Sequence, residues 1–239
     1  MTFVEGFLTP VPTANKDAYI KHASAAVPMF ARLGATRFLE AWGDDVPDGK
    51  LNDLKKAVNL EEGETVLFSW LEYPDKAARD AANTAMMADP RMETMATSMP
   101  FDGSRMIYAG FQAEVEDGMA SGTGYVDGFV LPVSPAKKDA YFDMARKASA
   151  VFRDHGASRV VEAWGDDVPT GKVTDYARAA HAAGDEVVVY SWVEWPSKEA
   201  RDAGMKAVMA DERMKTAPAD MPFDGKRMIY GGFATILDV

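Results

Sequence analysis

Hydrophobic and polar residues alternate or cluster in four short segments of the first half of the chain. These segments are rich in β-branched and aromatic residues, which is typical of strands. They are Phe3–Val11, Ala35–Trp42, Glu64–Tyr73 and Arg105–Val115. Two alanine-rich segments carry apolar residues mostly at helical spacing. They are Asp17–Leu33 and Asp75–Ala88, and the pattern allows an extension of the second through Met95.

Capping and turn residues mark the ends of these elements. Thr13 or Asn15 can cap the first helix, and Asp75 is expected to cap the second. A turn at Pro47–Gly49 and a short helix over Asn52–Val58 follow the second strand. The order β-α-β-β-α-β is that of the ferredoxin-like split βαβ unit, a four-stranded antiparallel sheet with both helices on one face.

The whole pattern recurs later in the chain. The octapeptide EAWGDDVP occurs at Glu40–Pro47 and at Glu162–Pro169, and this offset of 122 residues aligns the rest of the chain without a gap. About half of the aligned positions are identical. Each copy is far longer than a solenoid repeat, so we expect two units related by an approximate twofold axis. The expected division is a repeat over residues 1–116, a linker over 117–124 and a repeat over 125–239.

Alternation along the strands divides their side chains into two sets, because successive residues point to opposite faces. One set is small and aliphatic and is expected to pack under the helices: Val4, Gly6, Leu8, Leu39, Ala41, Leu67, Ser69 and Leu71. The other set is aromatic with carboxylates: Phe3, Glu5, Phe7, Phe38, Glu40, Trp42, Phe68, Trp70 and Glu72. A large aromatic face in water promotes association. We therefore expect the two aromatic faces to pack against each other within one chain.

Several longer motifs resemble those of a known family. VDGFVLPV, EAWGDDVP-x-GK, SWVEWP, RDA and MPFDGKRMIYGGF are similar to motifs of the YbaA-like family of small bacterial proteins, over nearly the whole of both copies. That family belongs to the dimeric α/β-barrel superfamily and usually has one copy per chain. The resemblance implies an α+β fold in which two ferredoxin-like (β-α-β-β-α-β) repeats pack sheet to sheet as an intrachain dimeric α/β barrel.

The resemblance assigns no catalytic residue, because the family has no established reaction. The wider superfamily includes cofactor-independent monooxygenases, muconolactone isomerase-like enzymes, haem-handling enzymes and ligand-binding regulatory domains. A shared fold does not choose among these activities.

Composition excludes several classes of function. The absence of cysteine removes disulfides, thiolate catalysis and cysteine metal sites. A formal net charge of −11 opposes binding to nucleic acid, and no apolar run reaches the roughly 20 residues of a membrane span. The N-terminal segment lacks the basic and apolar regions of a secretory signal. We expect a cytoplasmic protein with no nucleic-acid or membrane partner, whose repeats pair within the chain; its further oligomeric state is left open.

The acidic loop in each octapeptide is a weak candidate for a cation site. Its spacing is only partly that of a calcium loop, because Val46 stands at a ligand position and no glutamate follows at the required distance. In the second copy Thr170 replaces Asp48. We predict no metal at Asp44, Asp45, Asp166 or Asp167, and expect these aspartates to bond to local backbone amides.

Four glutamates are the candidate catalytic residues: Glu40, Glu72, Glu162 and Glu194. They are expected on the aromatic face, where burial raises the pKa of a carboxyl group and suits it to act as a general acid or base. The alternative is a buried ion pair with Arg37 or Arg105, or with Arg159 or Arg227 in the second copy. Such a pair would keep the carboxylates charged and inert.

Eight residues are candidates for ligand binding: Trp42, Trp70, Arg105, Tyr108, Trp164, Trp192, Arg227 and Tyr230. The two tyrosines either place a hydroxyl in a cavity or pack as aromatic rings. None of the three histidines recurs at the offset, which excludes a histidine mechanism shared by both copies. Ser69 and Ser191 lie in strands without a nucleophile elbow and are expected to serve packing.

Two functions fit this sequence. One is a small-molecule enzyme of the dimeric α/β-barrel type that needs no tightly bound cofactor. The other is a non-catalytic small-molecule binding or assembly protein. An enzyme should bring a carboxylate to a space that a ligand can enter, whereas an assembly protein should have its aromatic and acidic face fully packed and ion-paired.

Overall fold

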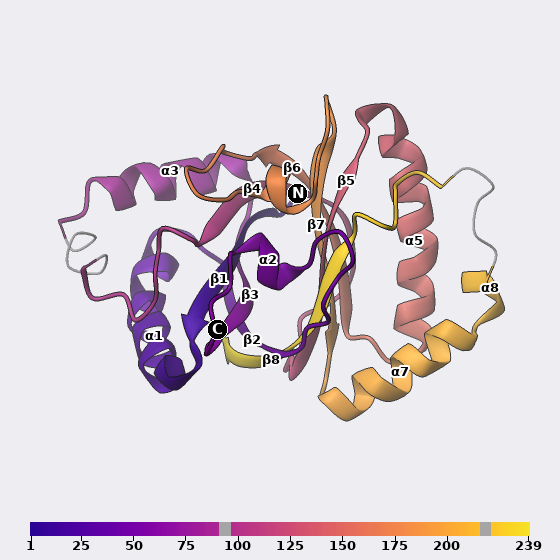
Figure 1. Ribbon diagram of the computed structural model, residues 1–239, viewed down its shortest axis with the longest axis horizontal. Helices are drawn as coiled ribbons and strands as arrows, with labels where there is room; N and C mark the ends of the chain where they lie inside the picture. Colours follow the sequence, from indigo (N-terminus) through magenta and orange to yellow (C-terminus); the bar gives the residue numbers. More distant parts are fainter. Residues whose placement is uncertain (91–96, 216–220) are drawn as a thin grey trace.

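The computed structural model describes residues 1–90, 97–215 and 221–239 (Figure 1). The strands of the first half are β1 (Phe3–Pro12), β2 (Arg37–Asp45), β3 (Glu64–Tyr73) and β4 (Ile107–Gly118). Those of the second half are β5 (Tyr125–Val133), β6 (Arg159–Asp167), β7 (Val187–Trp195) and β8 (Ile229–Asp238). All eight form one closed antiparallel barrel in the order β1-β3-β2-β8-β5-β7-β6-β4.

The long helices cover the outside of this barrel at its two sides (Figure 1). They are α1 (Lys16–Arg32), α3 (Lys76–Met87), α5 (Lys138–Asp154) and α7 (Lys198–Ala210). Shorter helices are η1 (Thr13–Asn15), α2 (Leu54–Ala57), η2 (Pro135–Lys137), α6 (Tyr176–Ala179) and α8 (Glu212–Lys215). Within the described ranges, no helix combines the length and the apolar character needed to cross a bilayer.

Helix capping follows the sequence in the second helix of each repeat. The Asp75 side chain accepts a hydrogen bond from the backbone of Ala78, and Ser197 does the same for Ala200. At α1 neither expected residue caps the helix, because Asn15 makes no capping hydrogen bond and Thr13 lies in η1. The extension of α3 toward Met95 falls on residues 91–96, which lie outside the described part of the chain.

Two seams join the repeats into one barrel. At one seam β2 pairs with β8, and at the other β4 pairs with β6. Each four-stranded sheet therefore has no free edge, because its outer strands hydrogen-bond to the other repeat. The predicted α+β class and the pairing of the two repeats within one chain are both confirmed.

The barrel interior is filled with aromatic rings from both repeats. Phe68 stacks on Tyr190 with ring centres 4.3 Å apart, and the Trp70 and Trp192 rings lie 4.2 Å apart. Other fully buried rings in this core are Phe111, Tyr176 and Phe233. Packing of this kind leaves a barrel whose centre is a core and not a channel.

Our assignment of faces was correct for β3 and wrong for β1 and β2. In β3 the aromatic residues point into the barrel, as expected. Trp70 pairs with Gly6 on one side and with Leu39 on the other, so the small residues of β1 and β2 share the interior with the large ones of β3. This arrangement fills the space evenly, because large and small side chains alternate around the barrel.

The aspartates of the two octapeptides form ion pairs across both seams. Asp45 forms an ion pair of 3.1 Å with Arg201 of the other repeat, and Asp44 contacts Lys198. At the opposite seam Asp166 lies 2.7 Å from Lys76, and Asp167 lies 2.9 Å from Arg79. The expectation that these aspartates bond to local amides was wrong.

Another aspartate holds the turn that follows the octapeptide. The Asp53 side chain accepts hydrogen bonds from the backbone of Gly49 and Lys56. Asp175 does the same for Gly171 and Arg178 in the second repeat.

Candidate functional site

A row of side chains crosses the helix-covered face of the first sheet. Cross-strand pairing puts Tyr108 beside Phe7. It also puts Phe7 beside Ser69, and Ser69 beside Glu40. Residues paired between antiparallel strands share one face, so the row is continuous. It runs from Tyr108, which is 49% exposed, to Glu40, which is 5% exposed.

The second repeat builds the same row from the aligned residues. Tyr230 pairs with Phe129, Phe129 with Ser191, and Ser191 with Glu162. Tyr230 is 48% exposed, close to the value in the first repeat. At the open end the Tyr and Phe rings lie side by side, with centres 6.4 Å apart in the first repeat and 6.3 Å apart in the second.

The first helix of each repeat completes the buried end of the row. In α1 the residues Tyr19, Ala23 and Ala26 are buried at helical spacing, so this face lies against the sheet. The Tyr19 hydroxyl donates to Glu40 at 2.8 Å, and Tyr141 of α5 donates to Glu162 at 2.7 Å.

The serine of the row is a second donor to the same carboxyl group. The Ser69 hydroxyl also donates to Glu40. In the second repeat Ser191 is paired with Glu162 across the strands, and its hydroxyl group acts to lower the pKa of Glu162. Both serines are buried in the sheet, as expected for packing, and Ser69 makes the hydrogen bond to Glu40 in addition.

Burial raises the pKa of Glu40 and of Glu162 from 4.5 to about 7, although the Ser and Tyr hydroxyl groups act in the opposite direction. Glu162 is partly exposed and Glu40 is buried. Among the described residues, no lysine or arginine forms an ion pair with either glutamate. A carboxyl group with this pKa is present in both protonation states near neutral pH and suits proton transfer.

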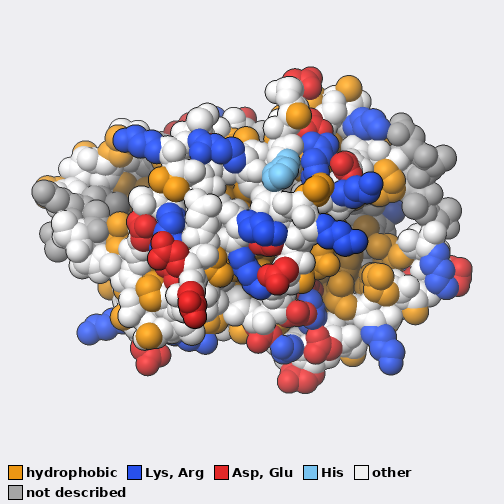
Figure 2. Space-filling view, in the orientation of Figure 1, with side chains coloured by type: hydrophobic (Ala, Val, Ile, Leu, Met, Phe, Trp, Pro, Cys, Tyr) orange, Lys and Arg blue, Asp and Glu red, His pale blue; other side chains and the backbone are white. Residues whose placement is uncertain are grey.

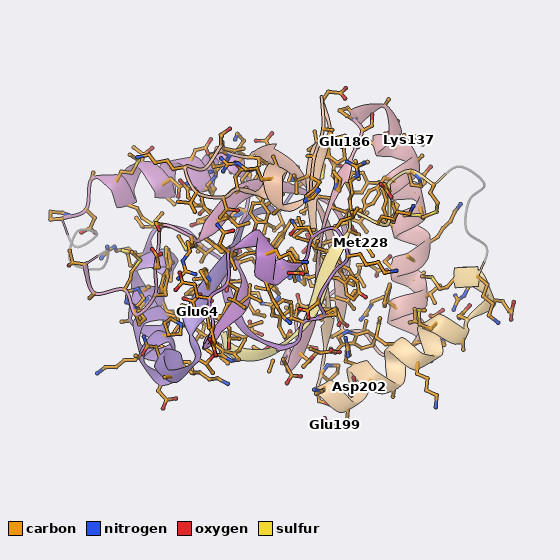
Figure 3. The ribbon with its side chains drawn as sticks, in the orientation of Figure 1. Glu64, Lys137, Glu186, Glu199, Asp202 and Met228 are labelled. Carbon is orange, nitrogen blue, oxygen red and sulfur yellow. The ribbon has the colours of Figure 1, made fainter. Side chains whose placement is uncertain are left out.

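A hollow on the surface lies near the second row. Figure 2 shows hydrophobic side chains gathering in a hollow between β8 and α5, the place where Figure 3 labels Met228. Met228 and Phe223 pack on the hydrophobic cluster that contains Tyr141, and the Phe223 ring centre lies 5.9 Å from that of Tyr141. Apolar surface therefore lies close to the tyrosine that contacts Glu162.

Glu72 and Glu194 lie inside the barrel and are ion-paired. Arg159 holds Glu72 with two hydrogen bonds of 2.6 and 2.9 Å. Arg37 holds Glu194 with bonds of 2.8 and 2.9 Å. Burial acts to raise the pKa of Glu194, but the hydrogen bonds and charge of Arg37 outweigh it and hold that pKa below its usual value. These two carboxylates match the inert alternative, and each is paired with the arginine of the other repeat.

The four candidate tryptophans separate into two pairs. Trp70 and Trp192 are in the barrel core, where each indole N–H donates at 2.9 Å to the glutamate two residues later. Trp42 and Trp164 lie on the helix-covered face, each with a lysine ammonium group 5.1 Å from its ring centre. The tryptophans therefore pack on both sides of the sheet and do not form one binding surface.

Arg105 and Arg227 are not part of either row. Arg105 makes two hydrogen bonds of 2.6 Å to Glu64, and Arg227 pairs with Glu186 at 2.5 and 2.8 Å. Figure 3 labels Glu64 and Glu186, which lie in different halves of the molecule. Each arginine also contacts a backbone carbonyl before the third strand of its repeat, which indicates a role in holding that loop.

Sequence reasoning missed four residues of the two rows. Tyr19 and Tyr141 are identical at the offset and lie on the buried face of the first helix, a signal that was present in the sequence. Phe7 and Phe129 are also identical, but the alternation placed them inside the barrel. Of the candidate residues, Tyr108 and Glu40 lie at the two ends of the first row, and Tyr230 and Glu162 lie at the two ends of the second.

An open depression of about 400 Å³ lies beside the start of α5. Its lining is mostly charged: Glu114, Lys138, Asp139, Phe142, Asp143 and Arg146. Lys138 pairs with Glu114 at 2.6 Å, and Arg146 pairs with Asp143 at 3.1 Å. Because these charged groups are paired with each other, they are less suited to proton transfer than the glutamates at the buried ends of the rows.

Structural comparison places this barrel among known folds. A candidate monooxygenase from Fusobacterium nucleatum matches with a TM-score of 0.61 at 10% identity, covering 99% of this chain and 93% of its own. A second candidate monooxygenase, from Lactobacillus acidophilus, matches with a TM-score of 0.58 at 11% identity over 100% and 95% of the two chains. An anthrone oxidase-like protein matches with a TM-score of 0.50 at 11% identity over 100% and 92%. At such low identity these matches show the fold alone.

Sequence comparison is more specific. The uncharacterised protein YbaA of Escherichia coli K12 is 58% identical over 117 residues, which is 49% of this chain and 100% of that protein. The YbaA protein of Shigella flexneri matches to the same extent. The model of the DUF1428 family, described as proteins of unknown function, matches residues 2–103 and again residues 124–225. The chain therefore belongs to the DUF1428 family and carries two tandem copies of its domain.

Proposed function

We propose that this protein is a cofactor-independent small-molecule enzyme in which Glu40 and Glu162 act as proton-transfer groups. The observation that carries the proposal is the cluster of Tyr19, Ser69 and Glu40, which recurs in the second repeat. Each cluster places a carboxyl group beside a tyrosine and a serine, and burial, full for Glu40 and partial for Glu162, raises its pKa to about 7. A group with this pKa is an efficient general acid and base at neutral pH.

The open end of each row favours a substrate with an apolar ring. Tyr108 and Phe7 offer adjacent aromatic faces, and Tyr108 is half-exposed. Aromatic rings of a ligand stack on such faces in offset or tilted geometry. Ser69 and Glu40 follow in the row, so the exposed rings and the buried carboxyl group lie on one face of the sheet.

The reaction class that needs only these groups is an isomerisation. The Glu40 carboxylate takes a proton from one atom of the substrate and returns it to another, so no electron acceptor is required. Solved structures of the same fold include candidate monooxygenases and an anthrone oxidase-like protein, which supports small-molecule chemistry without choosing the reaction. The expected cytoplasmic location belongs to this proposal, since small-molecule metabolism is concentrated there.

Solvent exchange tests the proposal without knowledge of the natural substrate. Ring-bearing ketones and lactones are incubated in D2O with the protein, and deuterium uptake by each compound is measured by mass spectrometry. We expect uptake with the wild type and its loss in the double variant Glu40→Gln, Glu162→Gln, because the amide cannot accept the proton. Glu62→Gln at an exposed position is the matched control. Equal uptake in the double variant and the wild type would reject the catalytic role of these glutamates.

A non-catalytic binding or assembly protein is the second candidate. It is favoured by the barrel interior, where Glu72 and Glu194 are fully paired with Arg159 and Arg37. In that case a ring compound should bind without deuterium uptake, and Glu40→Gln should leave its affinity unchanged.

A further inference from the structure

A buried polar cluster of the first repeat lies between α3 and the strands β1 and β3. Its members are Glu5, Tyr73, Arg79 and Asn83, of which Glu5 and Arg79 are each 4% exposed and Tyr73 is fully buried. Asn83 donates to the Glu5 carboxylate at 3.2 Å. Arg79 lies 3.9 Å from the same carboxylate, too far for a hydrogen bond.

Two buried atoms of this cluster have no partner in the described part of the chain. They are the Tyr73 hydroxyl and the Oδ1 atom of Asn83, whereas Arg79 forms ion pairs with Asp80 at 3.1 Å and with Asp167 at 2.9 Å. Buried polar groups in folded proteins are almost always satisfied, either by protein atoms or by an ordered water. Two unsatisfied atoms beside one buried carboxylate therefore indicate that a further group bonds to them.

The same place in the second repeat is complete. Asp127 accepts a hydrogen bond of 2.9 Å from the Trp195 indole and another of 2.9 Å from Nε of Arg201. Trp195 stands at the position of Tyr73, and Met205 at the position of Asn83. Among the described residues, the unsatisfied buried atoms include none from this second cluster. The repeats have thus diverged at one site, and only the first retains unpaired polar groups there.

We propose that the first repeat holds one hydroxyl oxygen, from an ordered water or from a small alcohol, bonded to Tyr73 and Asn83. The Tyr73 hydroxyl needs an acceptor, and the amide oxygen of Asn83 needs a donor. A hydroxyl oxygen supplies both at once. The Glu5 carboxylate repels an anion, and the Arg79 guanidinium group repels a cation. Because one charge of each sign lies nearby, we expect a neutral ligand.

A crystal structure of the full chain, grown without alcohols or polyols, tests the proposal. We expect an electron-density peak within hydrogen-bond distance of the Tyr73 hydroxyl and Asn83 Oδ1, and none beside Asp127 in the second repeat. A soak in methanol separates the two sources: a heavier peak identifies an alcohol site, and an unchanged peak identifies a water site. A dry cluster in which the Tyr73 hydroxyl donates directly to Glu5 would overturn the proposal.

A measurement in solution removes dependence on the crystal. Nuclear Overhauser effects between a long-lived water and the backbone amides of α3 are expected in the wild type. They should disappear in the variant Tyr73→Trp, Asn83→Met, Glu5→Asp, which copies the second repeat and so keeps a residue set already compatible with this fold. Absence of the effect from the wild type, together with a dry crystal site, would also reject the proposal.

Discussion

At the residue scale, Glu40 and Glu72 are both buried but have opposite surroundings. In the described part of the chain, the side chains that hydrogen-bond to Glu40 are those of Tyr19 and Ser69, and each donates a hydroxyl group. Glu72 lies 2.6 Å from Arg159 and 3.5 Å from Arg37. A buried carboxylate without a cation favours its protonated form, whereas one held by arginines is kept charged. Substitution of each by glutamine should therefore change stability in opposite directions.

The Glu40→Gln variant is expected to lose part of the pH dependence of folding. The pKa of Glu40 is raised from 4.5 to about 7, so the native state binds a proton that the unfolded chain releases between these pH values. The free energy of unfolding then falls as pH rises through this window, by about 3 kcal/mol for one such group. Urea unfolding at pH 5 and pH 8 should show a smaller fall for Glu40→Gln than for the wild type. The same fall in both proteins would contradict a protonated Glu40.

The Glu72→Gln variant is expected to be less stable at neutral pH. The substitution leaves the charges of Arg37 and Arg159 in a buried place with one carboxylate fewer, and such a loss costs about 3–5 kcal/mol. Chemical unfolding at pH 7 measures the change, with exposed Glu62→Gln as the control. Adding Arg159→Met should recover part of the loss, because it removes the guanidinium group that has lost Glu72 and, among the described residues, keeps only its contacts with Glu116 and Glu194. A single-variant cost no larger than that of the control would show that the pair contributes little.

At the scale of elements, the strands β1 and β5 depend on one glycine each for close approach across the barrel. A Cβ atom on Gly6 would lie 2.9 Å from the Tyr190 ring, and one on Gly128 would lie 2.6 Å from the Phe68 ring. These glycines therefore make room for the stacked pair of Phe68 and Tyr190. Glycine is therefore required at residues 6 and 128 by packing and not by backbone conformation.

The Gly128→Ala variant is expected to lower the free energy of unfolding by about 1–3 kcal/mol, the usual range for overpacking a core. Gly225→Ala is the matched control, since its Cβ would meet only Phe223 at an ordinary 3.8 Å. Chemical unfolding of both variants measures the difference. Phe68→Leu replaces the ring with a smaller side chain and should therefore remove part of the destabilisation caused by Gly128→Ala. A double-mutant cycle measures this coupling between the two positions. Additive effects would mean that the two positions do not meet.

At the scale of the whole molecule, the linker contributes far fewer contacts between the repeats than the two strand seams do. Residues 119–122 are exposed, whereas Thr123 is buried and donates to Glu194 at 2.5 Å. Each seam contains one strand pairing and the ion pairs of one octapeptide. Inside the barrel, Arg37 pairs with Glu194 and Arg159 pairs with Glu72 of the other repeat. Barrel closure removes every sheet edge, so separation of the halves would expose four strand edges and the aromatic core.

A chain cut between the repeats is therefore expected to stay together. A protease site inserted within residues 119–122 allows the cut after folding. Size-exclusion chromatography should then return one species of unchanged size, and the two fragments should separate only in denaturant. An uncleaved sample carrying the same insertion is the control. Release of half-sized species under native conditions would show that the linker, and not the seams, holds the barrel closed.

The element order of each repeat, the duplication and the second-helix caps were all readable from the chain. The elements and caps depend on local properties, namely hydrophobic periodicity, secondary-structure propensity and contacts between residues close in sequence. The same pattern in both copies gave each assignment a second, independent support. Glu40 is buried, as expected, and accepts a hydrogen bond from Tyr19, as a buried carboxylate requires, but it lies under α1 and not between the two sheets as the alternation predicted. The sequence offered four glutamates as candidates, but it did not show that, among the described residues, Glu72 and Glu194 are paired with arginines while Glu40 and Glu162 are not.

The orientation of β1 and β2 depends on long-range pairing. Alternation shows that each strand has two faces, but it carries no information on which faces of neighbouring strands coincide. That relation is set by the register of Gly6 and Leu39 against Trp70, which hydrogen bonds between distant segments establish. The same register decides that Glu40 lies under α1 beside Tyr19 while Glu72 lies inside the barrel beside arginines. Local sequence limits which residues are buried, and the pairing of distant strands chooses their neighbours and hence their chemistry.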